Sequence, residues 1–171
     1  MPRIAVRTVI AEASPCQSGS QPGLVDGRQS AAALAIRRGV CRRLRAEGYA
    51  LLPEVPLASG RRADLVALGR KAEIVIVEIK SSLADFMADR KWRDYLAHSD
   101  RFFFATSAEV PLDVFPEEAG LILADPFGAE ILREGAPQCR LPAARRKEML
   151  TRLARAGANR LHDLEDPGHG A

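Results

Sequence analysis

The stretch AEIVIVEIK at residues 72–80 decides the fold. Its apolar residues do not alternate with polar ones, which predicts a strand that is covered on both faces inside a sheet. Glu78 and Lys80 interrupt the apolar run near its end, and side chains two residues apart on a strand point to the same face. The segment therefore predicts an interior strand that ends in a carboxylate and an ammonium on one face.

Segments on either side of this strand predict an α/β fold with a mixed central sheet flanked by helices. The expected order is helix, three strands in an antiparallel meander, helix, strands, helix. The expected elements are a helix at 28–47, strands at 49–58, 61–68 and 72–80, a helix from Ser82 to about His98, strands at 101–106, 120–125 and 129–133, and a helix at 142–161.

Length and composition predict one soluble domain. The chain has 171 residues, of which 47% are hydrophobic and 27% charged, and no apolar run is long enough to span a membrane. We expect an N-terminal tail at 1–27, rich in Ser, Gln, Gly and Pro, a domain at 28–161 and a frayed end at 162–171. No export signal is recognisable, so a cytoplasmic location with no membrane partner is expected.

The turns between the three strands predict which residues face one another. With the second turn centred on Lys71, Asp64 lies opposite Glu78. With the first turn centred on Ser59, Glu54 flanks Asp64 on the same face. Three carboxylates are therefore expected to converge beside the lysine at the end of the interior strand.

Converging carboxylates in a sheet interior repel one another unless a cation compensates for their charge. Oxygen ligands without histidine or thiolate suit Mg²⁺ or Mn²⁺, which can activate water against a phosphodiester. Lys80 would orient that water or stabilise charge that develops on the phosphate. The chain has only four lysines among its 25 basic residues, which draws attention to this one. The other interpretation is a solvated ion pair at a strand end.

The spacing of these residues resembles a known nuclease pattern. Asp64, thirteen further residues and then Glu78-Ile79-Lys80 resemble the PD-(D/E)XK nuclease superfamily, with Ala63 where the superfamily name has proline. The stretches VEIKSSLADFMADRKWRDY and GLILADPFGAEILRE resemble the MmcB family of bacterial DNA-repair-associated proteins, and this resemblance covers about residues 30–160.

The resemblance implies a restriction-endonuclease-like core, DNA as substrate and Mg²⁺ as cofactor. It also implies that Asp64 and Glu78 are metal ligands and that Lys80 is the catalytic lysine; Glu54 is our candidate for a third carboxylate. The expected function is that of a Mg²⁺-dependent DNA phosphodiesterase in repair. The alternative is an adaptor module that binds DNA structures without cleavage and recruits other repair proteins. An RNA-directed enzyme and a homodimer both stay open.

Several basic residues are candidates for DNA contact, and each has a second interpretation. Arg62 shares the face of Asp64 and would contact phosphate or neutralise the acids. Lys91 is expected beside the site on the second helix. Arginine-rich faces of the first and last helices would follow a phosphate backbone or be solvated, with Arg37, Arg38, Arg145 and Arg146 as the candidates.

Four other residues of the second helix are expected to have structural roles. Trp92 and Tyr95 could stack on bases, but aromatic residues on a helix are more often part of a core. Asp85 and Asp89 are four residues apart and could suggest a metal pair. An acid at a helix start and an exposed acid account for them adequately.

Overall fold

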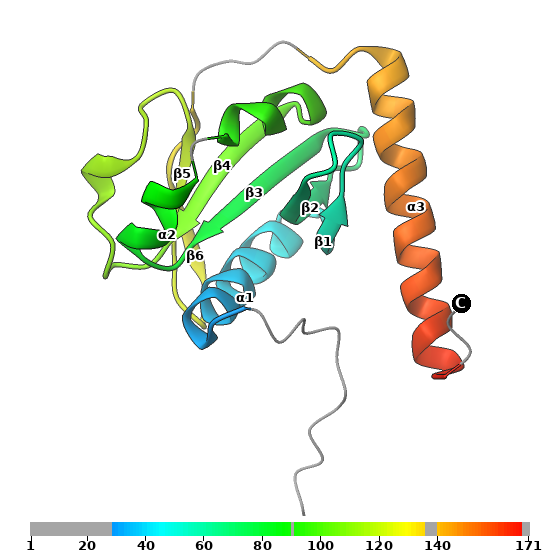
Figure 1. Ribbon diagram of the computed structural model, residues 1–171, viewed down its shortest axis with the longest axis horizontal. Coiled ribbons are helices and arrows are strands. Elements are labelled where there is room, and N and C mark those ends of the chain that lie inside the picture. The colour runs from blue at the N-terminus through cyan, green and yellow to red at the C-terminus, as the bar shows by residue number, and fades with distance from the viewer. Residues whose placement is uncertain (1–28, 90, 136–139, 169–171) are drawn as a thin grey trace, which may run out of the picture.

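The computed structural model of the chain describes residues 29–89, 91–135 and 140–168 (Figure 1). The expected N-terminal tail at 1–27 lies outside these residues. The elements are α1 (Ala31–Ala46), β1 (Ala50–Pro56), β2 (Arg62–Leu68), β3 (Ile74–Lys80), α2 (Leu83–Ala88), the 3₁₀ helix η1 (Trp92–His98), β4 (Arg101–Thr106), the 3₁₀ helix η2 (Leu112–Val114), β5 (Gly120–Ala124), β6 (Ala129–Arg133) and α3 (Ala143–Glu165).

The strands form one six-stranded sheet in the order β1-β2-β3-β4-β5-β6. β1, β2 and β3 make an antiparallel meander, β4 pairs parallel with β3 and with β5, and β6 pairs antiparallel with β5. Every residue of β3 is buried, because strands flank it on both sides and helices cover both faces. The mixed sheet, the order of the elements and the interior position of this strand are therefore confirmed.

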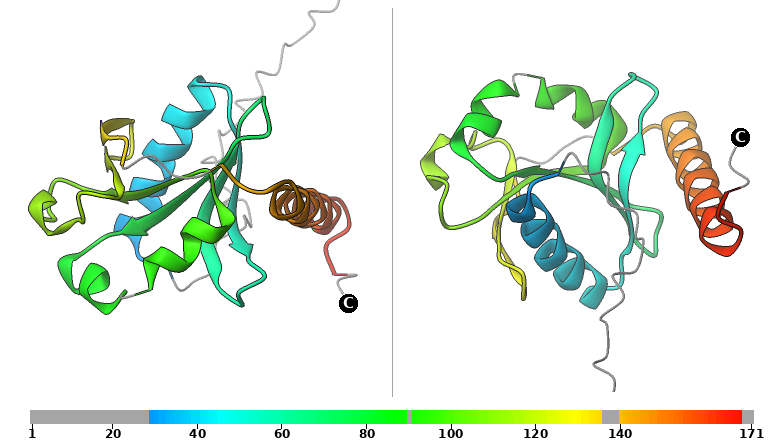
Figure 2. Two further views of the ribbon diagram at one scale, coloured as in Figure 1. Left: turned by 90° about the horizontal axis from the view of Figure 1, so that it is seen from above. Right: turned by 60° about the horizontal axis from the view of Figure 1, so that its bottom comes forward.

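Alternate residues of β3 enter two different cores. Val75 and Val77 pack with the apolar side of α1, whereas Ile74 and Ile76 pack on the opposite face with η1 and α3. Figure 2 shows the same division, with α1 on one side of the sheet and α2 and η1 on the other. Glu78 therefore points to the face that α2 and η1 partly cover.

α1 lies unusually close to the sheet. Its first turn is capped by Ser30, whose Oγ accepts a hydrogen bond from Ala33 N at 3.1 Å. Gly39 faces the β5–β6 turn, where an added Cβ would lie 2.1 Å from the carbonyl oxygen of Asp125. This close approach requires glycine and holds the middle of α1 against the β5–β6 turn. The start of α1 lies beside the end of β3, where Ser30 Oγ donates to Ser81 Oγ at 3.3 Å.

The expected continuous helix at 82–98 is wrong, because the chain leaves the helix at Asp89. α2 ends at Ala88, Asp89 has extended backbone angles (φ −94°, ψ 94°), and the 3₁₀ helix η1 starts at Trp92. The carboxylate of Asp89 turns toward Lys80 and forms an ion pair at 2.8 Å. A tertiary contact here overrides local helix propensity.

α3 lies beside β1 and η1 and continues to Glu165, beyond its expected end at Leu161 (Figure 1). Its exposed last turns add few contacts to the core, since its buried residues are Met149 and Leu153. In the described part of the chain, no helix combines the length and apolar character that a membrane span requires.

A largely buried ion pair ties the start of α3 to the start of β3. Arg146 donates from both terminal nitrogens to the carboxylate of Asp100, each at 2.6 Å, and the two side chains are only 14% and 10% exposed. Asp100 also accepts from Ile74 N at 2.8 Å and from Leu141 N at 2.9 Å. Burial acts to raise the pKa of Asp100, but these hydrogen bonds lower it to about 2.

This geometry predicts that Asp100→Asn lowers the free energy of unfolding by about 2 to 4 kcal/mol at pH 7, because it leaves the charge of Arg146 partly buried and uncompensated. A carboxyl whose pKa is lowered by folding stabilises the protein above its unfolded pKa of about 4. The difference between wild type and variant should therefore shrink as the pH falls from about 4 toward 2. Urea unfolding across this pH range measures it.

The control is Glu118→Gln, which removes an exposed ion pair with Arg93. Its effect on the free energy of unfolding should be far smaller, because solvent screens exposed pairs. Equal effects of the two substitutions at pH 7 would contradict the structural role of Asp100.

Candidate active site

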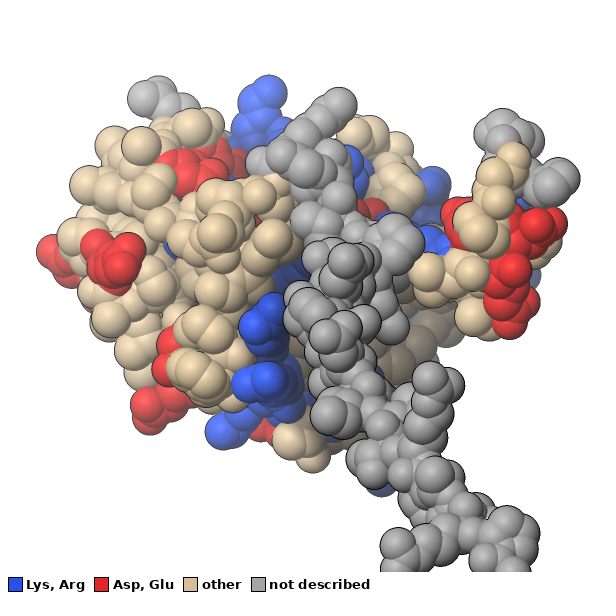
Figure 3. Space-filling model, turned by 90° about the horizontal axis from the view of Figure 1, so that it is seen from below, with Lys and Arg blue, Asp and Glu red and all other residues tan. Residues whose placement is uncertain are grey.

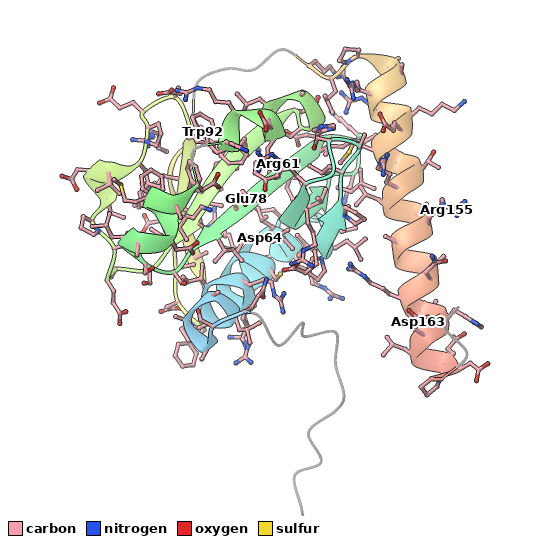
Figure 4. All side chains as sticks on the ribbon, viewed as in Figure 1. Arg61, Asp64, Glu78, Trp92, Arg155 and Asp163 are labelled. Carbon is pink, nitrogen blue, oxygen red and sulfur yellow. The ribbon has the colours of Figure 1, made fainter. Side chains whose placement is uncertain are left out.

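A cavity of about 590 Å³ opens where β2 begins and β3 ends, beside the start of α1. Figure 4 shows Asp64, Glu78 and Arg61 near one another on this part of the sheet, far from Arg155 and Asp163 on α3. A larger groove of about 790 Å³ between α1 and the β5–β6 turn has a mainly apolar lining. The smaller cavity brings together Arg61, Arg62, Asp64, Glu78, Lys80 and Asp89.

The predicted register is confirmed in both hairpins, as shown by the pairs Leu52↔Val66 and Pro56↔Arg62 in β1–β2 and Val66↔Ile76 and Leu68↔Ile74 in β2–β3. Beyond the last paired residues of β2 and β3, side chains replace the backbone ladder. Glu78 Oε1 accepts from Asp64 N at 3.1 Å, and Asp64 Oδ2 accepts from Ile79 N at 2.9 Å. These reciprocal hydrogen bonds hold the two carboxylates together.

Both carboxylates are costly to ionise in this position. Burial raises the pKa of Glu78 well above its usual range, and the charge of Asp64 raises it further. Burial raises the pKa of Asp64 to about 6, although the hydrogen bond from Ile79 N and the charge of Lys80 act in the opposite direction. A cation between the two groups would relieve both desolvation and repulsion.

The donor set fits a hard divalent cation. The side chains that line the cavity include carboxylates but no histidine or cysteine. Across residues 29–89, 91–135 and 140–168, no three His, Cys, Asp or Glu side chains are grouped so that they could hold a metal ion. Two carboxylates are nevertheless sufficient for Mg²⁺, which keeps several waters and binds substrate phosphate as well.

Lys80 is buried in the same cavity, only 5% exposed, with its ammonium on Asp89 at 2.8 Å. Burial acts to lower the pKa of Lys80, but the Asp89 carboxylate raises it above its ordinary value. The ammonium therefore stays protonated at neutral pH. Asp89 itself was expected to be an exposed acid, but its side chain is 17% exposed and paired.

Glu54 does not join the carboxylate pair. It has a left-handed backbone conformation (φ 51°), its Oε2 lies 2.5 Å from Arg62 Nε, and its Oε1 accepts from Gln29. Within the described residues, the expectation that Glu54 completes a set of three metal ligands is not met. Glu54 pairs instead with a neighbouring arginine, Arg62.

The basic candidates for DNA contact differ in their exposure and in their partners. Lys91, Arg38 and Arg145 are exposed, and Arg145 forms an ion pair with Glu148 at 3.6 Å. Arg37 donates to Gln29 at 2.9 Å beside the cavity. Arg146 is committed to Asp100 and therefore has a structural role. Figure 3 shows a band of Lys and Arg side chains on the lower face of the molecule, the side on which α1 lies in Figure 1.

Trp92 and Tyr95 belong to the core, as expected: both rings stack on Phe102. Tyr95 also lines the cavity, where its hydroxyl donates to the carbonyl oxygen of Arg62 at 3.4 Å. Burial, followed by the charge of Glu78, raises the pKa of Tyr95, so its phenol stays a hydrogen-bond donor.

Sequence reasoning did not place Gln29, Arg61, Asp89 or Tyr95 in the cavity. Asp89 and Tyr95 reach the cavity only because the expected helix is broken between them. The four-residue spacing of Asp85 and Asp89 was visible, but a continuous helix gives no reason to turn Asp89 toward Lys80.

Comparisons with known proteins give a family and a structural relative. The family model described as "DNA repair protein MmcB-like" matches residues 20–168. The solved structure of a protein of unknown function from Silicibacter pomeroyi is 46% identical and covers 81% of this chain and 95% of its own, with a TM-score of 0.76. No curated protein matches the sequence.

The raised pKa of Asp64 predicts that Asp64→Asn stabilises the metal-free protein by about 1 to 3 kcal/mol at pH 8. A carboxyl whose pKa is raised by folding lowers the free energy of unfolding of the protein as the pH rises from about 4, the pKa of the unfolded state, through about 6. The gain should therefore vanish at pH 4. Urea unfolding in EDTA at both pH values measures it.

Asp113→Asn, which replaces an exposed acid of η2, is the matched control and should change stability little at either pH. A variant at Asp64 that is less stable than wild type at pH 8 would show that the carboxylate is well compensated in the metal-free protein.

Proposed function

The chain belongs to the MmcB-like family of DNA repair proteins, and we propose that it acts on DNA as a Mg²⁺-dependent phosphodiesterase, with Mn²⁺ as an effective substitute. One observation carries this proposal: the buried carboxylate of Glu78 and the half-buried carboxylate of Asp64, both with raised pKa values, lie beside a protonated lysine at the edge of an open cavity. Structural acids are normally compensated, whereas this pair gains its compensation from a bound cation.

Asp64, Glu78 and Lys80 have different roles in the proposed hydrolysis. Asp64 and Glu78 would hold the divalent cation, which supplies an activated water and an electrophile for the phosphate oxygens. Lys80 is protonated, so it serves as a hydrogen-bond donor to charge that develops on the phosphate. This protonation argues against Lys80 as the base that accepts a proton from water.

The order of elements supports a PD-(D/E)XK core for this domain. A helix, an antiparallel meander, a broken helix and a parallel strand follow one another, and the acids lie where the second and third strands separate. That arrangement matches the pattern in which the superfamily carries its acidic residues and its lysine.

DNA would reach the cavity over a basic rim. Arg61 and Arg62 line the opening, and exposed Lys91 follows at the start of η1. Contacts of this kind are made with phosphates, so binding should weaken steeply with added salt. Arg38 and Arg145 are the exposed candidates farther along α1 and α3.

A second function is a candidate because Glu54, which was expected to join Asp64 and Glu78 as a third metal ligand, pairs with Arg62 instead. With Glu54 held by Arg62 and Gln29, the domain could bind DNA structures without cleaving them and recruit other repair proteins. Cleavage distinguishes the two functions.

The test is a labelled panel of single-stranded, duplex, nicked, flapped and four-way DNA, with matching RNA, incubated with Mg²⁺, Mn²⁺ or EDTA. Wild type should cut at least one DNA in a metal-dependent manner. Asp64→Ala and Lys80→Ala should reduce the rate by about 10² to 10³-fold, because each removes charge stabilisation at the reacting phosphate. The control Asp163→Ala lies on α3 and should cut like wild type.

Retained DNA binding with no cutting by wild type in any metal would support the adaptor function instead. Cutting of RNA alone would exclude DNA as the substrate, and cutting that survives both substitutions would place the catalytic site elsewhere.

A further inference from the structure

Lys80 has a choice of carboxylate partners, and the structure shows it with one of them. It shares a face of β3 with Glu78, two residues away, and the negative charges of Glu78 and Asp85 also act on it. Its ion pair is with Asp89, at 2.8 Å. Within the described residues, no ion pair joins Lys80 to Asp64 or Glu78.

Hydrogen bonds within its own segment hold Asp89 in place in addition to the ion pair with Lys80. The backbone N–H of Asp89 donates to the carbonyl oxygen of Phe86 at 3.1 Å, and Asp89 Oδ1 accepts from Lys91 N at 3.1 Å. The next element, η1, is anchored by Trp92, whose ring stacks on Phe102 of β4. The break between α2 and η1 therefore presents a fixed acceptor to the lysine.

This arrangement matters because a lysine beside two desolvated carboxylates is a competitor for a metal ion. The four-carbon stem of lysine is flexible, and its ammonium would satisfy the charge of Asp64 and Glu78 as a divalent cation does. We propose that Asp89 is a positioning residue that holds the Lys80 ammonium off the Asp64–Glu78 pair and so keeps that pair open to a divalent cation. This inference rests on the proposed function, since it assigns the pair to a cation.

The same contact explains the departure from helical structure at this point. A continuous helix would carry Asp89 on the α2 surface, where no lysine partner is expected. The extended backbone at Asp89 instead directs its carboxylate into the cavity that Asp64 and Glu78 line. The broken helix is thus part of the site.

The test compares Mn²⁺ affinity, measured by isothermal titration calorimetry, in Asp89→Ala and Asp85→Ala. Asp85 is the matched control. It lines the same cavity, but its Oδ2 accepts from Ser81 N at 3.2 Å, and within the described residues Lys80 forms its ion pair with Asp89 and not with Asp85. Both substitutions remove one negative charge near the pair. The dissociation constant should rise about tenfold or more in Asp89→Ala and less than about threefold in Asp85→Ala, tenfold being 1.4 kcal/mol.

A double variant separates positioning from simple loss of charge. In Asp89→Ala/Lys80→Met the competing ammonium is gone, so Mn²⁺ affinity should return at least to that of wild type. If Asp89→Ala weakens Mn²⁺ binding equally with and without Lys80, Asp89 acts only through its charge and the inference fails.

A metal-free readout decides the matter independently of any cation. In a crystal structure of Asp89→Ala grown in EDTA, Lys80 Nζ should lie within about 3.2 Å of a carboxylate oxygen of Asp64 or Glu78. An ammonium directed to solvent or to Asp85 would overturn the inference.

These experiments also distinguish failure of this inference from failure of the proposed function. Absence of Mn²⁺ binding by wild type would defeat the proposed metal site, while the metal-free structure still decides the role of Asp89. Mn²⁺ binding without DNA cleavage would defeat the proposed catalysis and leave the positioning role to the affinity measurements.

Discussion

Repulsion between two carboxylates at the end of β3 is the constraint on which the site depends. The hairpin register brings Asp64 to Glu78, and their reciprocal hydrogen bonds to the backbone prevent them from moving apart. Burial raises the pKa of both groups. The surrounding elements hold this unfavourable arrangement in place: α1 closes one face of the sheet, and α2 and η1 flank the other.

The carboxylates at the two ends of β3 have pKa values that are shifted in opposite directions. At its start, Asp100 is largely buried but receives two backbone N–H groups and a guanidinium, which lower its pKa to about 2. At its end, Glu78 is buried with one backbone donor, and its pKa is raised. The first carboxylate stabilises the fold, whereas the second is the one that we propose to bind a cation. This contrast in pKa is the physical basis on which we propose a structural role for Asp100 and a functional one for Glu78.

Much of the fold and the centre of the site could be predicted from the sequence. The uninterrupted apolar run of β3 determines its interior position, and short turns fix the register that joins Asp64 to Glu78. Those features depend on local pattern and on the period of a strand. The break at Asp89, the left-handed backbone of Glu54 and the tether of Arg146 depend on partners distant in sequence, and no local pattern reports them.

The central claim is that Asp64 and Glu78 together hold a divalent cation. Anomalous diffraction from crystals of the wild-type protein soaked in Mn²⁺ tests it most directly, with Glu78→Gln crystals as the control. We predict one anomalous peak between the two carboxylates at the bond lengths of an oxygen-ligated ion, about 2.0 to 2.3 Å, and no such peak in the variant. Wild-type crystals in saturating Mn²⁺ with no peak at this position would contradict the account.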